Sequence, residues 1–214
     1  MVNWCPTCRK SASAVTSETV RSSAFYLKFD FSREALKILP EVAAIMKTEG
    51  AYKVSAVVWM TPLDTLTQVT GLAFHPSAIY VAVKAPTLEG TEIWIGALKL
   101  QENFEKAGGS EKISRPLLTF SPEKLEGLQL KNPLTSELVT LMKSDQVPLE
   151  QGSGFVSFAG AASGSRMQLG PSSTESAEVL EELRDSGKLV QQTPLEQKVF
   201  RCGTCQNQTV LRFT

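Results

Sequence analysis

The sequence predicts a mainly β protein of the sandwich type, with several helices and a small separate module made from the two chain ends. Three observations support this fold class. Residues 24–100 contain five apolar or alternating segments, separated by turns that contain proline and glycine. A single helical pattern interrupts them, whereas a parallel α/β sheet would need a helix after each strand. The four cysteines form two Cys-x-x-Cys pairs at opposite ends of the 214 residues.

The first half of the chain predicts most of the sheet. Apolar and polar residues alternate over 24–31, which is the period of a strand with one buried face. Ser32 is placed to cap a helical stretch that Pro40 divides and Gly50 ends. Four further strands are expected at residues 51–60, 66–75, 78–85 and 91–100.

The second half predicts more helix and more irregular structure. Residues 103–112 are charged and contain glycine, which indicates an excursion from the sheet. Residues 150–173 predict a long glycine-rich loop around the short strand FVSFA. Helices are expected near residues 121–130, 135–144 and 174–186, and short strands near 188–192, 197–201 and 208–213.

This division predicts two domains. A terminal module is expected to contain residues 1–10 with 196–214, and a β-rich main domain is expected over 24–195, with a more helical second half. Residues 11–23 are small and polar, and we expect them to form a linker or an arm. A chain of 214 residues can bury a sizeable core by itself, so a metal is not needed merely to make it fold.

The charge balance excludes some general binding functions. Lys and Arg total 22, and Asp and Glu also total 22. The whole chain therefore has no general attraction to nucleic acid or to anionic membranes, and any such binding must come from a local patch. No stretch approaches the roughly 20 apolar residues of a bilayer-spanning helix, and the N-terminus lacks a signal-peptide pattern. We expect a protein that is not secreted and has no membrane partner.

The cysteine pairs carry the strongest chemical signal. Two residues between paired cysteines let a tight turn aim both sulfurs at one tetrahedral ion. Cys5, Cys8, Cys202 and Cys205 are therefore expected to bind one structural Zn²⁺ in a zinc-ribbon-like module, with the main domain inserted between its halves. Two alternatives stay open. One is thiol–disulfide exchange, which normally needs a helix N-terminus to lower the thiol pKa, and the other is a different metal, such as iron.

Closing the two chain ends around a metal would also gather positive charge. The residues concerned are Arg9, Lys10, Lys198, Arg201 and Arg212, with Glu196 as the acidic residue of these segments. Trp4, Phe200 and Phe213 lie among them, and basic residues interleaved with aromatic ones can contact phosphates and stack on bases. This arrangement therefore predicts RNA binding by the terminal module. The alternative is that the aromatic residues form the small core of the module, while the zinc thiolates cancel part of the charge.

The sequence contains no recognisable catalytic motif. The single histidine, His75, lies between an apolar segment and Pro76, a context that favours a structural role. Ser153 and Ser163 have no activating base near them in the sequence, and Asp30, Asp64 and Glu92 are isolated carboxylates near strand ends. These observations predict a protein that is not an enzyme and has no small-molecule substrate.

Residues 25–75 follow a recognisable succession of elements. The succession is the strand FYLKFDF, a helix through Leu36, Leu39 and Met46, the strand YKVSAVVWM, the turn Thr61-Pro62-Leu63-Asp64-Thr65 and a strand containing Gly71. It resembles the opening of the single jelly-roll coat proteins of small positive-strand RNA plant viruses. The resemblance implies an eight-stranded sandwich that assembles into a shell or tube around RNA. The chain departs from this family in lacking a long basic arm and in being more helical after residue 100.

Together these observations lead to one first hypothesis. We expect a non-enzymatic structural protein that self-associates, a viral coat or capsid component with a structural zinc site, located in the cytoplasm or the virion. The alternative is a zinc-ribbon adaptor that binds nucleic acid or a partner protein, with the β-rich middle as its scaffold. An enzyme acting at the glycine-rich 150–173 loop is a third hypothesis.

Overall fold

The chain folds into two compact units. The computed structural model describes residues 2–5, 7–11, 14–61, 63–87, 89–159, 176–207 and 210–212. The terminal unit contains residues 1–23 and 193–214, and the main unit contains residues 24–192. Strands β3 and β12 each begin in one unit and end in the other, so each unit is described by itself below.

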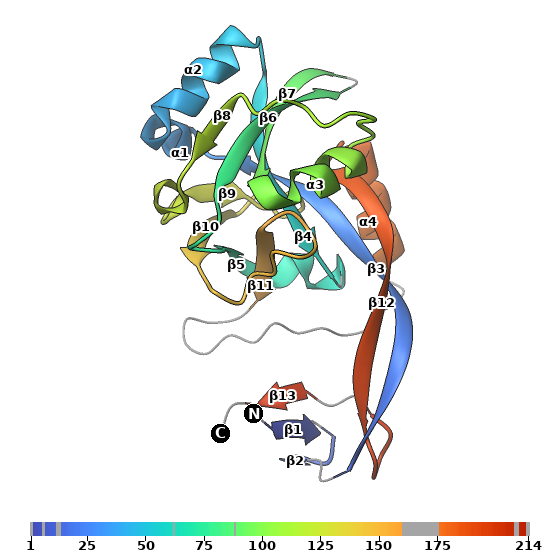
Figure 1. Cartoon of the computed structure of the whole chain (residues 1–214). Helices are drawn as coiled ribbons and strands as arrows, with labels where there is room; N and C mark the ends of the chain where they lie inside the picture. Colours follow the sequence, from blue (N-terminus) through green and yellow to red (C-terminus); the bar gives the residue numbers. More distant parts are fainter. Residues whose placement is uncertain are drawn as a thin grey trace. The chain divides into compact units, whose positions relative to one another are not determined.

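A large mixed sheet forms the main unit (Figure 1). Its strands are β3 (Val15–Phe31), β4 (Lys53–Met60), β5 (Val69–Phe74), β6 (Tyr80–Thr87), β7 (Gly90–Ala97), β8 (Leu118–Phe120), β9 (Gln129–Lys131), β10 (Leu138–Lys143), β11 (Phe155–Ala159) and β12 (Leu189–Cys202). Their order is β12-β3-β9-β10-β5-β11-β4-β7-β6-β8, and β3 also pairs with β4. The pairings therefore join β3, β9, β10, β5, β11 and β4 into a closed ring. The expected mainly β fold is confirmed.

The core lies inside this ring because the strands alternate as their sequences predict. Leu27 and Phe29 of β3 point inward beside Val58 and Ala56 of β4, and all four are fully buried. The opposite face of β4 is buried as well, at Val57 and Trp59. Helix α3 (Gln101–Ala107) packs over the neighbouring strand β7, where Phe104 lies against Gly96. Burial on both faces makes the central strands continuously apolar.

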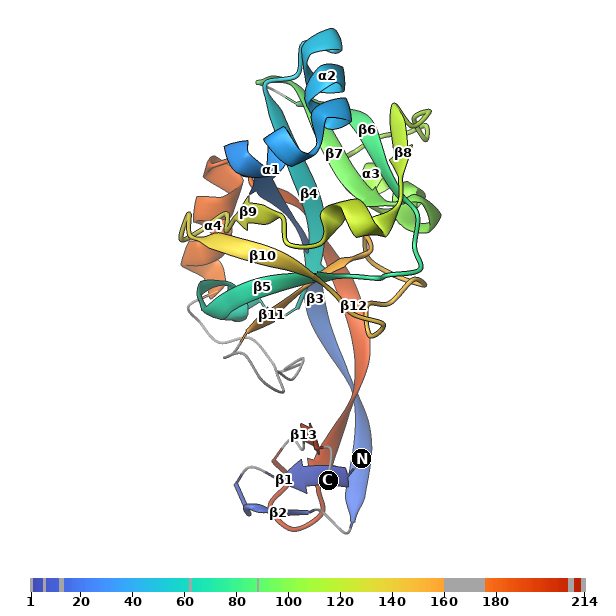
Figure 2. The same ribbon diagram turned by 90° about the vertical axis from the view of Figure 1, so that its left-hand side faces the viewer.

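Helices cover parts of the sheet (Figure 2). They are α1 (Arg33–Ile38), α2 (Pro40–Thr48), α3, α4 (Ser176–Asp185) and the 3₁₀ segments η1 (Leu63–Gln68), η2 (Leu98–Leu100) and η3 (Pro122–Leu125). The predicted cap is confirmed, because Ser32 Oγ accepts a hydrogen bond of 3.1 Å from the Ala35 amide. Pro40 begins α2, and Gly50 follows its end with a φ of +63°. No helix in the described ranges is long and apolar enough to cross a membrane.

The jelly-roll expectation is wrong. A jelly roll is built from antiparallel strands. Here β4 pairs in parallel with both β7 and β11, and β10 pairs in parallel with β5. A helix, a 3₁₀ segment or a long connection separates the partners in each parallel pair, as parallel pairing requires.

Several expected elements of the second half are also different. Residues 135–144 contain strand β10, whose Val139 and Leu141 are buried, because pairing with β5 and β9 decides between strand and helix for this short apolar run. Residues 103–112 begin within helix α3. Residues 121–130 hold the short η3 and the start of β9. The strand FVSFA and the helix near 174–186 are confirmed as β11 and α4, whereas the loop beyond residue 159 lies outside the described residues.

The segments next to the chain ends contain more strand than we expected, including residues 15–23, where we expected a linker or an arm. Residues 15–23 belong to the long strand β3, and 189–202 form one continuous strand, β12, in place of two short ones. These two strands are neighbours in the sheet. Residues 15–19 are all exposed, so no buried face imposes the alternation that would reveal a strand in the sequence.

The terminal unit contains a three-stranded sheet. Its strands are β1 (Val2–Cys5), β2 (Lys10–Ser11) and β13 (Val210–Arg212), in the order β13-β1-β2. Val2 pairs with Arg212, and Cys5 pairs with Lys10, all antiparallel. Backbone pairing therefore brings the two ends of the chain together.

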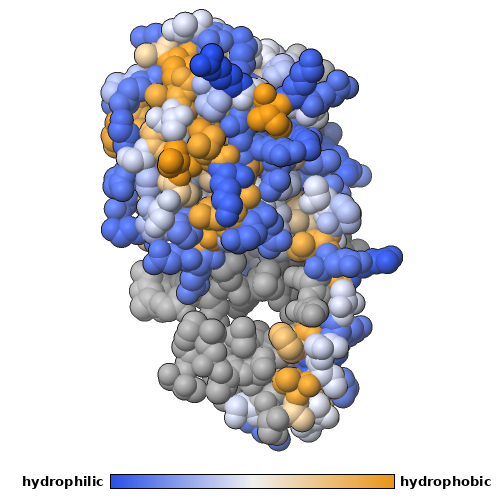
Figure 3. All heavy atoms as spheres, viewed as in Figure 1, coloured by the Kyte–Doolittle hydropathy of each residue, from blue (hydrophilic) through white to orange (hydrophobic). Residues whose placement is uncertain are grey.

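Apolar side chains also reach the surface of the main unit, where they alternate with hydrophilic ones (Figure 3). The large exposed apolar residues of this unit include Ile38, Ile79, Leu138 and Met142. Such scattered exposure is normal for a folded domain and needs no ligand to explain it.

Gly154, in the turn before β11, occupies a position that we expect to tolerate only glycine. Gly154 has a φ of +88°, and a Cβ added there would lie 2.4 Å from Ala97 Cβ. We expect Gly154→Ala to lower the free energy of unfolding by about 2–3 kcal/mol, because backbone strain and overpacking add. Gly127→Ala is the matched control: its φ is +77°, yet nothing lies within 4 Å of the added atom. Urea unfolding followed by tryptophan fluorescence tests this, and equal losses for both variants would contradict it.

Candidate functional site

The four cysteines of the terminal unit form one cluster. Their Sγ atoms all lie within 4.8 Å of one another, and Cys5 Sγ is 3.4 Å from Cys205 Sγ. Four sulfurs placed about 2.3 Å from a tetrahedral ion are separated by about 3.8 Å, so this donor set fits a single thiolate-binding metal. Cys5 and Cys202 are buried, and Cys8 and Cys205 are half-buried. The cluster could therefore hold a metal such as zinc, with no ligand position left over for catalysis.

Backbone hydrogen bonds shape the two turns that hold the cysteines. The Cys8 amide donates to Cys5 Sγ at 3.3 Å in the first turn. In the second turn, the Gln206 amide donates to the Cys202 carbonyl, and the Cys202 amide donates to the Asn207 carbonyl, both at 2.8 Å. Asn207 Nδ2 also donates to Thr7 Oγ1 at 2.9 Å and so links the two turns directly.

The thiols of this cluster differ in pKa. Amide donors from Cys205 and Thr204 lower the pKa of the Cys202 thiol to about 6. Hydrogen bonds with the Cys205 and Cys5 thiols raise the pKa of Cys8 to about 12. Among the described residues neither pair begins a helix, since each lies in a turn between strands. The arrangement therefore lacks the helix that a thiol–disulfide exchange site normally uses.

The structure describes the side chains of three of the five residues in the expected basic patch, Arg9, Lys10 and Arg201. Arg201 Nε forms an ion pair with Glu18, and its Nη1 donates to the Gln206 carbonyl at 3.2 Å. Arg9 and Lys10 are exposed beside the first cysteine turn. The side chains of Lys198, Arg212, Trp4 and Phe213 lie outside the described residues. The sequence does not predict the pairing of Glu18, because residues 11–23 indicate a linker or an arm.

Two of the three isolated carboxylates, Glu92 and Asp30, belong to structural ion pairs of the main unit. Glu92 is almost fully buried and accepts hydrogen bonds from Lys28 Nζ (2.9 Å), Tyr52 OH (2.7 Å) and Trp94 Nε1 (2.8 Å). Burial opposes ionisation of Glu92, but these three donors outweigh it and lower its pKa. Asp30 accepts from Ser55 Oγ at 2.9 Å and pairs with Lys188. The side chain of Asp64 lies outside the described residues.

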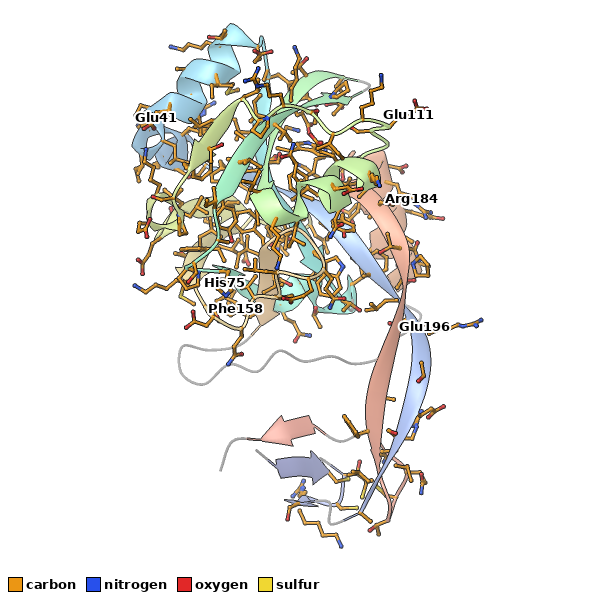
Figure 4. The ribbon with its side chains drawn as sticks, viewed as in Figure 1. Glu41, His75, Glu111, Phe158, Arg184 and Glu196 are labelled. Carbon is orange, nitrogen blue, oxygen red and sulfur yellow. The ribbon has the colours of Figure 1, made fainter. Side chains whose placement is uncertain are left out.

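His75 and Ser153 do not form a catalytic pair. His75 Nδ1 accepts a hydrogen bond of 3.1 Å from the Ser77 amide, which assigns it a role in closing a turn after β5 (Figure 4). Ser153 is fully buried, and its Oγ has no hydrogen-bond partner. A nucleophile must reach its substrate, so a fully buried hydroxyl does not serve as one. Ser163 lies outside the described residues.

A segment rich in threonine lies at one edge of the ring. Strands β4 and β11 are parallel neighbours, with Trp59 opposite Val156, so their carboxyl ends lie at the same edge. Four threonines lie between the end of β4 and the second residue of β5: Thr61, Thr65, Thr67 and Thr70. The end of β11 lies beside them, because Ala159 pairs with Val69. We call this set of four residues the threonine edge.

The threonine edge is accessible and lies away from the histidine. Thr61 and Thr65 are half-buried, and Thr67 and Thr70 are exposed. His75 follows the opposite end of β5. From the sequence, the stretch from Thr61 to Thr65 predicts only a turn. The one feature of the sequence that could have indicated the threonine edge is the presence of four threonines within ten residues, directly after a buried strand.

Comparison with known proteins gives sequence relatives of one kind. No protein-family model matches the chain. It is 32% identical over 157 residues to isoleucine–tRNA ligase of Desulfotalea psychrophila, covering 72% of this chain and 15% of the ligase. It is 24% identical over 253 residues to isoleucine–tRNA ligase of Thermococcus kodakarensis, covering 100% of this chain and 22% of the ligase. The chain thus spans only a small part of the length of the curated relatives it matches.

A solved structure has a similar fold. The cytosolic leucyl-tRNA synthetase editing domain of P. knowlesi matches with a TM-score of 0.51 and 10% identity, over 65% of this chain and 59% of that chain. At this identity the match concerns the fold alone.

These comparisons correct the first hypothesis. The sequence relatives are isoleucine–tRNA ligases, which are enzymes, so the expected non-enzymatic coat protein is wrong. The expected self-assembly and the virion location were inferred from that resemblance and are withdrawn with it. The adaptor alternative is not supported either, because the similarity covers 72% of the chain and extends far beyond the terminal segments.

Proposed function

We propose that this chain is an editing domain of an aminoacyl-tRNA synthetase, which hydrolyses the ester bond of a mischarged tRNA. One observation carries the proposal: most of the chain is similar to a short part of an isoleucine–tRNA ligase. The likeness of its fold to a synthetase editing domain supports the same reading. Synthetases that select small apolar amino acids need such a second site, since binding alone discriminates one methylene by only about 10- to 200-fold.

The reaction needs water and positioned hydrogen-bond groups. A water oxygen attacks the carbonyl carbon of the aminoacyl ester, the bond from that carbon to the ribose oxygen breaks, and the ribose oxygen takes up a proton. We assign this reaction to the threonine edge, because its hydroxyls can both orient a water molecule and donate to the developing oxyanion. Their position at the carboxyl ends of β4 and β11, where they are half-buried or exposed, supports this assignment.

We further propose that the cysteine cluster holds zinc and that the ion is structural. Four thiolates close a tetrahedral site, and zinc is the metal most often bound in this way. Its ligands would be Cys5, Cys8, Cys202 and Cys205, so the ion would join the two halves of the terminal unit. A location in the cytoplasm, where tRNA charging takes place and thiols stay reduced, accords with both proposals.

Hydrolysis can be measured directly. We expect the zinc-loaded protein to release valine from valine-charged isoleucine tRNA faster than a buffer blank does, and to leave the isoleucine-charged tRNA largely intact. Thr65→Val keeps the side-chain shape and removes the hydroxyl, so we expect the rate to fall by about 100-fold, which is typical for loss of one positioned donor. The measurement is the release of labelled amino acid over time.

The control for this substitution is Thr119→Val. Thr119 is exposed on β8, a strand outside the ring, and its loss should leave the rate within about twofold of the wild type. Folding of each variant is checked by circular dichroism. A folded, metal-loaded protein that does not accelerate release of either amino acid would disprove the hydrolytic function. Equal rates for Thr65→Val and the wild type would instead remove the threonine edge from the mechanism.

A further inference from the structure

Positive charge is concentrated in the terminal unit. Residues 1–23 and 193–214 carry six Lys and Arg against two Glu, a formal charge of +4. The main unit carries 16 Lys and Arg against 20 Asp and Glu, a formal charge of −4. Zinc with four thiolates adds a charge of −2, which leaves the terminal unit positive. The net charge therefore favours attraction of the RNA backbone to the terminal unit, although the whole chain is neutral.

Ion pairs within the terminal unit show which of its described Lys and Arg side chains are already paired with a glutamate. Glu18 pairs with Arg201, and Glu196 pairs with Arg21 at 3.4 Å, so both glutamates of the unit are occupied. Arg9 and Lys10 are exposed, and neither has an ion-pair partner within the part of the chain that the structure describes. These two cations directly follow the first cysteine turn.

The backbone of the two cysteine turns supplies a second, independent observation. Arg9 directly follows Cys8 with a φ of +51°, and Gln206 directly follows Cys205 with a φ of +59°. Glycine adopts this left-handed conformation without steric cost, whereas most residues with a Cβ, arginine and glutamine among them, are disfavoured there. The turns nevertheless carry an arginine and a glutamine, and both side chains are exposed. Strained positions of this kind concentrate at functional sites.

We propose that Arg9, Lys10 and Gln206 contact the sugar–phosphate backbone of the tRNA. We call these three residues the turn contact. The inference rests on the proposed function, because it takes the RNA to be the tRNA that carries the ester. Arginine binds phosphate oxygens with two parallel hydrogen bonds, lysine adds a point charge, and the glutamine amide donates one more hydrogen bond. The cysteine cluster and the Asn207–Thr7 hydrogen bond hold the turns that present them.

Binding of uncharged tRNA tests the turn contact without requiring hydrolysis. We expect Arg9→Gln to weaken binding by about three- to tenfold and to lower the slope of log K against log salt by about 1. Arg21→Gln is the matched control, since it removes the same charge from a side chain that is 90% exposed and is paired with Glu196. We expect the control to change affinity less than twofold. Fluorescence anisotropy of the zinc-loaded protein at several salt concentrations gives both quantities.

A second variant separates an RNA contact from a structural role. Arg9→Gly relieves the left-handed strain, so we expect the thermal midpoint of the terminal unit to stay the same or rise while tRNA affinity falls. A residue with only a structural role would not lose affinity without losing stability. Gln206→Gly should likewise keep or raise the thermal midpoint while it lowers the affinity for tRNA. The slope of log K against log salt should not change, because no charge is removed.

The outcomes distinguish this inference from the proposed function. Equal weakening by Arg9→Gln and Arg21→Gln, or no weakening by either, would overturn the turn contact even if the protein hydrolyses mischarged tRNA. Binding that depends on Arg9, in a protein that releases no amino acid, would support the turn contact and overturn the hydrolytic function.

Discussion

Removing the metal from the cysteine cluster is expected to unfold the terminal unit and to leave the main unit folded. Structural zinc contributes about 10–16 kcal/mol of apparent binding free energy in small zinc modules, more than a unit of this size could replace by packing. Chelation, or substitution Cys202→Ser, should therefore make residues 1–23 and 193–214 sensitive to protease. Limited proteolysis with mass mapping measures this, and native mass spectrometry of the untreated protein should show one zinc ion per chain.

The control for metal loss is Ser11→Ala, which changes an exposed residue of β2 next to the cluster. It should retain zinc and protease resistance. Chelation that leaves the cleavage pattern of the chain ends unchanged would contradict the structural role of the metal.

Metal binding should also depend on pH with a defined sign. Thiols must lose their protons to bind zinc, and hydrogen bonds with neighbouring thiols raise the pKa of Cys8 to about 12. Binding near pH 7 should therefore release at least the Cys8 proton. Cys202, with its pKa of about 6, becomes protonated below that value. Affinity should consequently fall as the pH is lowered, and proton release in weak buffer is the direct measure.

The second large effect is expected at the buried Lys28–Glu92 pair of the main unit. The exposed fractions of the two side chains are 8% and 1%, and the two atoms Lys28 Nζ and Glu92 Oε2 are 2.9 Å apart. Glu92→Ala leaves a buried ammonium without its counter-charge and also removes the acceptor for Tyr52 and Trp94. We expect the free energy of unfolding to fall by about 3–5 kcal/mol, which is typical of breaking one side of a buried pair.

Replacing both charges tests whether the cost comes from the uncompensated ion. The double variant Lys28→Met with Glu92→Leu should recover much of the lost stability, because two apolar side chains of similar volume need no counter-charge. The exposed pair Lys84–Glu49 provides the control, since Lys84→Met should cost at most about 1 kcal/mol. Urea unfolding of all variants measures these values, and equal losses for Glu92→Ala and Lys84→Met would contradict the prediction.

The pKa of Glu92 fixes the pH dependence of this contribution. Its pKa is lowered in the folded state, so the pair stabilises the fold fully above the unfolded-state pKa of about 4.3. That stability is lost as the pH falls through the folded pKa. Below about pH 4, the wild type should therefore lose more stability than the variant Glu92→Gln does.

Local sequence patterns predicted the first half of the main unit because each element there contains its own signal. Four apolar residues alternate in β3, and one inner face of the ring buries them. Ser32, Pro40 and Gly50 define the limits of α1 and α2 through capping, ring geometry and a positive φ. Each of these effects acts within a few residues, so neither the sheet order nor the partner strands are needed to recognise it.

The candidate site was harder to predict, because its parts are ordinary residues. The threonine edge contains no motif and no activated base in the sequence. The residues from Thr61 to Thr65 by themselves predict only a turn. What makes these hydroxyls a candidate site is the parallel neighbour β11, whose end reaches the same edge from a distant part of the sequence. Without that pairing and the comparisons, neither the proposed hydrolytic function nor its substrate class could be predicted.

The sequence by itself therefore determined the mainly β character, the strands and capped helices of the first half, and the presence of two metal-type cysteine pairs. Only the tertiary structure decided that the strands close into a ring with parallel pairs and that residues 135–144 form a strand. It alone also showed that Arg201 is paired with Glu18, which leaves Arg9 and Lys10 available for a ligand. The physical reason is the range of the interactions. Alternation, capping and Cys-x-x-Cys spacing act between near neighbours, whereas strand order, ion pairing and cysteine clustering join residues that meet only after folding.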